Sequence, residues 1–261
     1  IQKYNITSGL SSDYIRAICQ DSEGYIWLAS SNGLNRFDGY SSKSYKPDYN
    51  KPNTFTNLDF NSLTEDKDGN LWIGTDHSGV FIFNKQTQSV EIIDRSDTTG
   101  LAILDNNINH VYCDSRQRVW ICTFSGLNMY DIHTGKMSSY SGIAESGKPY
   151  PLGTITFTYE DSRGKILIGS WGNGLYTYNE DTDDFNRFIL GRPENLNDSI
   201  NRVNSILEDP DGNYWLGTWE GGLLKTKFED YKELVVLQHY NMNFGEEYTI
   251  SSNIIYCLYL D

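Results

Sequence analysis

Apolar and polar residues alternate along most of this chain with a period of two, which is typical of half-buried β-strands. The pattern is clearest over residues 61–94, where NSLTED, LWIGT, VFIFN and SVEIID are separated by DKDGN, DHSG and a polar loop. No segment keeps a helical period over the roughly 10–12 residues that a helix needs. We therefore expect an all-β protein of short strands joined by turns.

The same group of strands recurs along the chain. Each copy has an aspartate before a tight turn, at 45- to 48-residue spacing: Asp21, Asp66, Asp114, Asp161 and Asp209. Six residues after these aspartates stand Trp27, Trp72, Trp120, Leu167 and Trp215. A glycine and an apolar residue follow, with the glycines at Gly33, Gly79, Gly126, Gly174 and Gly222. An internal repeat of this length predicts a structure made of similar, stacked units.

Each unit is expected to be a four-stranded antiparallel sheet. Such a sheet cannot bury both faces alone, so the units should stack as the blades of a β-propeller, with the tryptophans packed between neighbouring sheets. The predicted blades span residues 12–48, 57–94, 105–141, 153–190 and 201–240. Because SSNIIYCLYLD at the end resembles NRVNSILED, residues 251–261 should open a sixth blade. The sequence is then expected to be a fragment of a propeller, five blades and one strand long.

Composition narrows the range of partners. The chain has 261 residues, 21 Lys and Arg against 35 Asp and Glu, and a net charge of -14. Nucleic acids and anionic membranes need clustered basic residues for binding, so neither is an expected partner of this sequence. Aromatic residues make up 14% of the chain, which allows a large packed core and argues against disorder.

Several features that resemble chemical sites are better explained as structure. The segments 66–70 and 209–213 resemble the start of a calcium loop, but later ligands are missing and Asp-x-x-Gly suits a hairpin turn, in which Gln117 replaces glycine once. Gly74, Gly169 and Gly217 are expected to be small because sheets approach closely there. The four cysteines lack metal spacing, and Cys113 and Cys122 should be free rather than joined. No catalytic residues, metal ligands or cofactor are predicted.

Candidate ligand-binding residues are expected at one end of every sheet. Two repeat positions meet there, one just after the second strand and one five residues before the repeat aspartate. The selected residues are Asp76, Phe124, Trp171 and Trp219 at the first position and Arg16, Asn61, Asn109 and Asn204 at the second. Aromatic rings beside amide groups suit a sugar, because pyranose C–H faces stack on rings and amides both donate and accept hydrogen bonds. Packing between blades and capping of strand ends remain an equal alternative.

The strings GYIWLASSNGLNRFDGY, GNLWIGTDHSGVFIFN, RVWICTFSGLNMYD and GNYWLGTWEGGLLK resemble the two-component regulator propeller repeat, D-x-x-G-x-[LI]-W-[IL]-G-T followed by x-x-G-L. The resemblance extends over essentially the whole chain. It departs from the pattern at Leu167 and Gln117. It implies the N-terminal part of the periplasmic sensor region of a hybrid two-component histidine kinase of the Bacteroides type, with about seven blades in each propeller.

The function implied by this resemblance is sensing without catalysis. An oligosaccharide from glycan breakdown would bind the periplasmic region and signal across the membrane. The implied partners are the remaining propeller, a β-sandwich and the kinase domains of the same chain, and a second copy in a homodimer. Two alternatives stay open: a protein-interaction scaffold, or a propeller lyase or hydrolase acting on polysaccharides.

Overall fold

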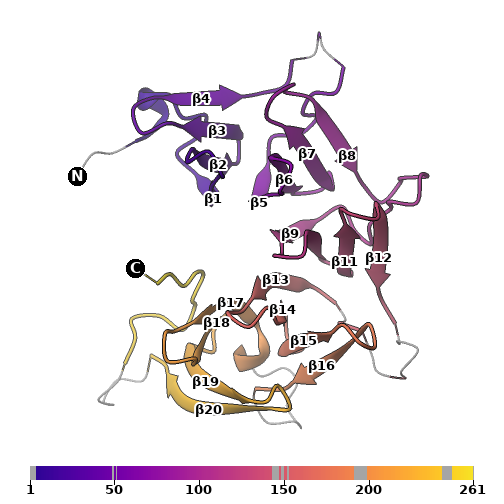
Figure 1. The fold of residues 1–261 in the computed structure, drawn as a ribbon. Helices are drawn as coiled ribbons and strands as arrows, with labels where there is room; N and C mark the ends of the chain where they lie inside the picture. The colour runs from indigo at the N-terminus through magenta and orange to yellow at the C-terminus, as the bar shows by residue number, and fades with distance from the viewer. Residues whose placement is uncertain are drawn as a thin grey trace. The chain divides into compact units, whose positions relative to one another are not determined.

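The computed structural model describes residues 4–48, 50, 52–142, 147, 150–151, 153–190, 199–242 and 249–260. Within these ranges the chain forms twenty strands and two short 3₁₀ turns, η1 (Ile6–Ser8) and η2 (Ser199–Asn201). The strands make five four-stranded sheets in which each strand pairs with the next along the chain (Figure 1). Neighbouring strands run antiparallel, as in β1–β2 and β19–β20. The predicted all-β fold of antiparallel four-stranded sheets is confirmed.

The sheets follow the sequence repeat in order. The first contains β1 (Ile15–Gln20), β2 (Ile26–Ser30), β3 (Gly33–Phe37) and β4 (Ser42–Tyr45). The second contains β5 (Phe60–Glu65), β6 (Asn70–Thr75), β7 (Val80–Asn84) and β8 (Val90–Ile93). The third contains β9 (Ile108–Cys113), β10 (Arg118–Thr123), β11 (Gly126–Asp131) and β12 (Lys136–Tyr140). The fourth contains β13 (Ile155–Glu160), β14 (Ile166–Ser170), β15 (Leu175–Asn179) and β16 (Asp184–Phe188). The fifth contains β17 (Val203–Glu208), β18 (Tyr214–Thr218), β19 (Leu223–Glu229) and β20 (Glu233–Tyr240).

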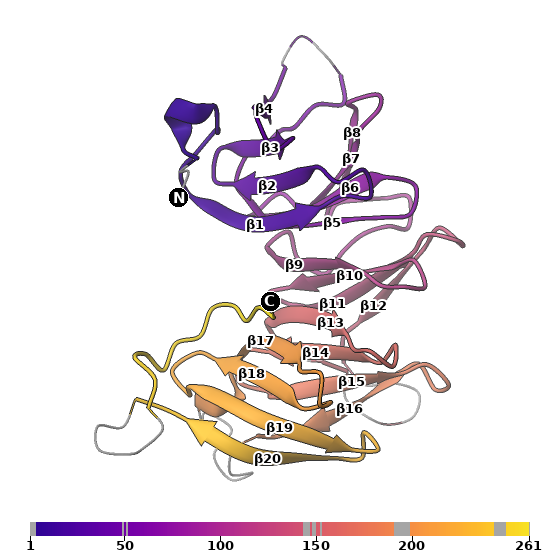
Figure 2. The same ribbon diagram turned by 60° about the vertical axis from the view of Figure 1, so that its left-hand side comes forward.

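The chain divides into two compact units, an N-terminal unit (Ile1–Ser139) and a C-terminal unit (Tyr140–Asp261). Within each unit the first strands of successive sheets contact one another. In the N-terminal unit β1 lies against β5 and β5 against β9, and in the C-terminal unit β13 lies against β17 (Figure 2). Neighbouring sheets within a unit therefore stack through their first strands, as blades of a propeller do.

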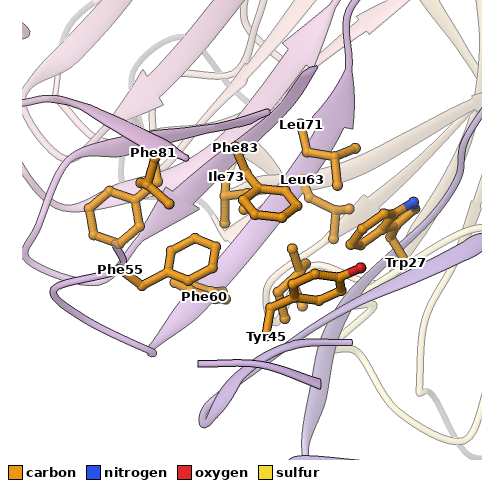
Figure 3. Packing of buried hydrophobic residues seen from close by; sticks show 12 residues of the cluster. Trp27, Tyr45, Phe55, Phe60, Leu63, Leu71, Ile73, Phe81 and Phe83 are labelled. Carbon is orange, nitrogen blue, oxygen red and sulfur yellow. The ribbon is translucent and has the colours of Figure 1, made fainter. Parts of the chain in front are cut away.

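Trp27 and Trp72 pack between sheets, as predicted, whereas Trp215 stacks on Tyr240 of its own sheet with 5.7 Å between ring centroids. Trp27 is buried in the core shared by the first two sheets, where its ring centroid lies 5.4 Å from that of Tyr45 and 6.0 Å from that of Phe83. Figure 3 shows Trp27 and Tyr45 facing Phe83 and Leu71 of the second sheet. Trp72 takes the corresponding place against the third sheet. Burial of rings of this size is a main source of stability for the stacked sheets.

The spacing of six residues between aspartate and tryptophan has a simple cause. In the second repeat Asp66 Oδ1 accepts the backbone N–H groups of Asp68 and Asn70, at 3.0 and 2.9 Å. Its Oδ2 accepts the indole N–H of Trp72 at 2.9 Å. The same indole-to-carboxylate bond occurs in the first, third and fifth repeats. The carboxylate thus joins the turn to the buried tryptophan, and its oxygens are already used by the fold, as expected for a turn rather than a calcium loop.

The fourth repeat satisfies its aspartate in another way. Leu167 has no side-chain N–H group, and Oδ2 of the buried Asp161 instead accepts hydrogen bonds from the hydroxyl groups of Tyr214, at 2.7 Å, and Tyr231. Arg163 donates to the Tyr214 hydroxyl at 2.9 Å, and its guanidinium carbon lies 4.3 Å from the Tyr231 ring centroid. Desolvation, with the hydrogen bond to Asp161, raises the pKa of Tyr214 to about 12 and that of Tyr231 further, so both hydroxyls stay protonated donors at neutral pH. Two tyrosines of the fifth repeat therefore replace the missing indole.

The small residues in the second strands are explained by close contacts. A Cβ on Gly74 would lie 2.6 Å from Cγ2 of Ile108 in the next sheet, and one on Gly217 would lie 2.6 Å from Cγ2 of Ile255. At Gly169 the obstacle is the ring of Phe157, 2.0 Å away on the adjacent strand of the same sheet. Close approach between sheets is therefore confirmed for Gly74 only, because Gly217 meets Ser205 of its own sheet and Ile255 of a segment that is not a strand, and Gly169 makes room for a ring within its own sheet.

Gly74→Ala is expected to destabilise the N-terminal unit by about 1–3 kcal/mol, because the added methyl group overlaps the fully buried Ile108. Urea unfolding measures the loss. The double variant Gly74→Ala with Ile108→Ala removes the clashing atom and should lose less than the sum of the two single variants. Additive losses would show that the two side-chain positions do not interact.

Two details of the turns and cysteines agree with expectation. Gln117 takes a positive φ of 63°, at the repeat position where the other four repeats have a glycine with positive φ. Cys113 and Cys122 are thiols and are not joined by a disulfide bond, and Cys122 is buried in β10. Cys113 pairs across the strands with Val119, and Cys122 pairs with His110, so the two cysteines are not cross-strand neighbours.

The expected opening strand of a sixth blade is not formed. The described residues 249–260 contain no strand, and none of the other described strands pairs with them. A strand requires a neighbour that forms a continuous series of hydrogen bonds with it, and the described part of this segment makes only separate backbone bonds, such as that from Ile255 to Thr218. It still follows the repeat at one point, because Asn253 accepts the N–H of Gly222 at 2.9 Å, just as Asn106 accepts that of Gly79.

Candidate functional site

The two repeat positions selected from the sequence meet at one end of each sheet, where the first strand begins (the mouth end). In each sheet, the residue directly after the second strand donates its backbone N–H to the carbonyl group of the residue directly before the first strand. The five pairs are Ser31 with Tyr14, Asp76 with Asp59, Phe124 with Asn107, Trp171 with Thr154, and Trp219 with Arg202, at 2.9–3.4 Å. All five sheets therefore present the selected side chains at equivalent positions.

Three of the residues that stand five before a repeat aspartate donate a side-chain hydrogen bond to a later part of the chain. Asn61 Nδ2 donates to the carbonyl of Ile108 at 3.1 Å, and Asn204 Nδ2 makes a longer contact of 3.5 Å with the carbonyl of Ile255. Thr156 donates in the same way to Val203. These side-chain donors are therefore bonded within the protein, which is what the alternative to ligand binding, the capping of strand ends, requires.

In the N-terminal unit the selected residues form a charged group. Arg16 Nη1 lies 3.0 Å from Asp59 Oδ1 and also donates to the side chain of Asn61. Asp76 lies next to Asp59 through its backbone bond, and its carboxylate is 3.6 Å from Nε2 of His77. The structure thus brings Arg16 and Asn61 into contact and places Asp76 beside Asp59, and the exposed Tyr14 ring lies 5.7 Å from the guanidinium carbon of Arg16.

Two other selected residues lie in the third sheet. The ring of Phe124 is 49% exposed, and Asn109 lies near the start of β9. Both belong to the N-terminal unit, whereas Trp171, Trp219 and Asn204 belong to the C-terminal unit. The selected residues therefore fall into two groups, each confined to one unit.

The C-terminal unit carries an aromatic cluster at its mouth end. The ring centroids of Trp171 and Trp219 are 5.4 Å apart with an angle of 51° between the planes. Tyr256 meets Trp219 edge to face, also at 5.4 Å. Trp171 is 40% exposed and Tyr256 is 71% exposed, so much of the ring surface is open to solvent. The aromatic cluster, defined as Trp171, Trp219 and Tyr256, can offer ring faces to a ligand.

A charged pair borders this cluster. The guanidinium carbon of Arg202 lies 5.6 Å from the Trp171 ring centroid, within the range of a cation–π contact. Its Nη1 donates to Glu220 Oε2 at 2.9 Å. Arg202 is also fixed through its backbone, because its carbonyl accepts the N–H of Trp219 at 2.9 Å. The cluster therefore has a hydrogen-bond donor and an acceptor at its edge.

Tyr256 is held in place by contacts around its neighbour Ile255. Ile255 donates its backbone N–H to the carbonyl of Thr218 at 3.0 Å, and its own carbonyl faces Asn204. Gly217 allows the Ile255 side chain to approach closely. Asn204 and Gly217 thus support the segment that carries Tyr256, and they are positioning residues for the cluster.

Sequence reasoning missed Arg202, Glu220 and Tyr256. Tyr256 was detectable, because it stands five residues before Asp261 and so shares its repeat position with Asn204 and the other selected residues. Arg202 and Glu220 carried no such signal, since no other copy of the repeat has an arginine or a glutamate at these positions. Among the described residues no group of three or more His, Cys, Asp or Glu is placed to hold a metal ion.

The repeat aspartates lie at the opposite end of the sheets. The lowered pKa of one of them, Asp209, predicts that the stability of the fold depends on pH. Desolvation acts to raise the pKa of Asp209, but hydrogen bonds from the backbone and side chain of Asn213 and from the Trp215 indole outweigh it and lower the pKa to about 2. A carboxylate with a lowered pKa stabilises the fold above its unfolded pKa, near 3.8, and this stabilisation is lost as the pH falls towards 2.

The midpoint of urea unfolding should therefore stay level from about pH 7 to 5 and fall between about pH 4 and 2. Asp209→Asn, which cannot ionise, should have a lower midpoint at neutral pH and a shallower fall in acid. An equally steep acid fall in this variant would contradict the assignment of the effect to Asp209.

Comparison with protein families finds four matching segments. Residues 9–32, 54–77, 102–125 and 197–220 match the family described as two component regulator propeller. These segments lie in the first, second, third and fifth repeats, each of which has the repeat tryptophan. The fourth repeat, with Leu167, lies outside them.

Known proteins with similar sequence or structure point the same way. A curated relative, Histidine kinase P4 from Formosa agariphila, is 28% identical over 256 residues, which are 95% of this chain and 18% of that protein. The solved extracellular domain of a hybrid two-component system from B. thetaiotaomicron matches with a TM-score of 0.74 and 23% identity, over 100% of this chain and 39% of that one. This chain therefore spans about a fifth of its curated relative and less than half of the solved domain.

A likeness to enzymes extends to the fold alone. Virginiamycin B lyase from Staphylococcus aureus matches with a TM-score of 0.60 at 12% identity, over 86% of this chain and 70% of the lyase. In the described part of the chain no helix is long and apolar enough to span a membrane.

Proposed function

We propose, since this chain is built of two-component regulator propeller repeats, that it is a non-catalytic part of the periplasmic sensor region of a hybrid two-component histidine kinase. Its relatives support this assignment, because they include a histidine kinase and the extracellular domain of a hybrid two-component system. We further propose that it detects oligosaccharides released by glycan breakdown.

The aromatic cluster is the single observation that carries the sugar proposal. Exposed rings that face solvent at one end of two neighbouring sheets suit the apolar C–H faces of pyranoses, and Arg202 and Glu220 supply polar contacts beside them. Large exposed aromatic groups of this kind usually mark a binding surface. Sugar binding accounts for both the rings and the charged pair beside them.

Signalling would follow from differential binding. The full protein would contain this sensor part, a further propeller, a β-sandwich and a second copy of the chain. The ligand must bind one arrangement of these parts more tightly than it binds another arrangement. The energy available to switch the kinase is that difference in affinity and no more. Within each unit, sheets held together by a buried aromatic core would move as one body, which suits transmission of such a change.

Calorimetric titration of the complete sensor region with a panel of oligosaccharides tests the proposal. The expected result is binding of at least one of them with 1:1 stoichiometry per chain and no turnover of the sugar. Binding of a protein partner without any sugar would favour the interaction scaffold instead. Cleavage of a polysaccharide by the purified region would favour a lyase or hydrolase.

A further inference from the structure

Glu220 occupies a backbone conformation that does not favour its residue type. It lies in the loop between β18 and β19 with φ 69°, in the left-handed region where a Cβ is strained. In the fourth sheet the same repeat position is Gly172, with φ 93°, which adopts this conformation without strain. Two glycines, Gly221 and Gly222, follow Glu220 directly. The loop therefore requires a left-handed residue, and a glutamate is present in place of the easier glycine.

A gain in folding stability from the ion pair with Arg202 does not explain why a glutamate stands at this position. Both side chains remain partly open to solvent, and exposed ion pairs contribute little to folding. The backbone conformation alone does not assign a role to Glu220, because His77 has a similar φ of 75° at the same repeat position of the second sheet. The role is indicated by what lies beside it: the guanidinium group that Glu220 orients also lies over the Trp171 ring.

The chemistry of this group selects a kind of sugar. An aromatic ring face binds the apolar face of a pyranose. A guanidinium donates a hydrogen bond to a hydroxyl oxygen, and a carboxylate accepts a hydrogen bond from a hydroxyl group. Arg202 and Glu220 together can therefore hold two adjacent hydroxyl groups of one sugar unit. Their charges cancel, and the chain as a whole has a net charge of -14, which repels anionic ligands.

We infer that Trp171, Arg202 and Glu220 form a subsite for one neutral pyranose unit. The sugar stacks on Trp171, and two neighbouring hydroxyl groups bind Arg202 and Glu220. Glu220 determines the specificity for neutral sugars, because its carboxylate accepts a hydrogen bond from a sugar hydroxyl and repels carboxylate or sulfate groups. This inference rests on the proposed function and names the class of sugar that the site takes.

The test compares neutral and acidic sugars on the complete sensor region. The probes are gluco-, manno-, galacto- and xylo-tetraoses, and galacturonate, mannuronate and guluronate tetramers. At least one neutral series is expected to bind at least about tenfold more tightly than any uronate, with an affinity that changes less than about twofold between low and high salt. Tighter binding of uronates, weakened by salt, would overturn the neutral subsite while leaving the sensor proposal intact. Binding of none of the probes would overturn both.

Glu220→Gly separates a ligand role from a structural one. Because glycine relieves the strain, the thermal midpoint should be unchanged or higher, while affinity for the neutral sugar falls about tenfold or more. His77→Gly is the matched control, since His77 has φ 75° at the same repeat position of the second sheet and lies in the other unit. It should leave sugar binding unchanged. A loss of thermal stability without a loss of binding in Glu220→Gly would overturn the inference.

Discussion

Trp219→Ala is expected to reduce oligosaccharide affinity about 30- to 1000-fold, which corresponds to about 2–4 kcal/mol. Trp219 contacts both other members of the aromatic cluster, with 5.4 Å between ring centroids in each case. Its removal therefore leaves Trp171 and Tyr256 without their common support, so the binding surface loses its shape as well as one ring. Calorimetric titration of the variant with the best sugar from the panel measures the effect.

The matched control for this variant is Tyr40→Ala. Tyr40 is 94% exposed and lies in the turn between β3 and β4, away from the mouth end of its sheet. It should bind the sugar as the parent does. If both variants lost affinity equally, or if Trp219→Ala kept it, the aromatic cluster would not be the binding surface. Thermal unfolding of both variants confirms that the fold is retained.

Asp66→Ala should be the most destabilising of the substitutions considered, by about 3–4 kcal/mol. It removes the carboxylate that accepts two backbone N–H groups and the indole N–H of Trp72, which is buried and would be left without its acceptor. Hydrogen bonds to charged groups contribute about 1.5–3 kcal/mol, and an unsatisfied buried donor costs about 1–3 kcal/mol. Urea unfolding followed by tryptophan fluorescence measures the loss.

Asp68→Ala provides the comparison, since Asp68 lies in the same turn with an exposed side chain. Its loss should stay within about 0.5 kcal/mol, as for most surface substitutions. Equal losses in the two variants would mean that the turn needs acidic residues in general. A small loss in Asp66→Ala would contradict the account of why aspartate and tryptophan recur six residues apart.

The sequence repeat predicted the sheets because each repeat is a local structure. The turn, its aspartate and the tryptophan lie within seven residues, so a spacing in the sequence translates directly into a hydrogen bond in the structure. Gly74 was also predictable, because a small residue at a constant repeat position indicates a close approach between sheets. Position in the repeat likewise placed Trp171 and Trp219 together.

What the repeat could not predict depends on residues that occur once. Tyr231 replaces the indole missing at Leu167 from 70 residues beyond Asp161, and no spacing within one repeat indicates that contact. Arg202 and Glu220 are likewise single departures from the repeat, and their partnership depends on the loop conformation at Glu220. No strand forms among the described residues of the expected opening strand, 251–260, because a periodic pattern does not supply the neighbouring strand that pairing requires.

Amide hydrogen exchange of the complete sensor region, with and without a saturating oligosaccharide, tests the central claim that the aromatic cluster binds sugar. Ligand binding slows exchange where it stabilises the folded state. The account predicts new protection in peptides that cover residues 169–174, 200–204, 217–222 and 253–258, the segments that carry the cluster and its charged pair. Protection confined to other segments, with exchange in these four unchanged, would contradict it.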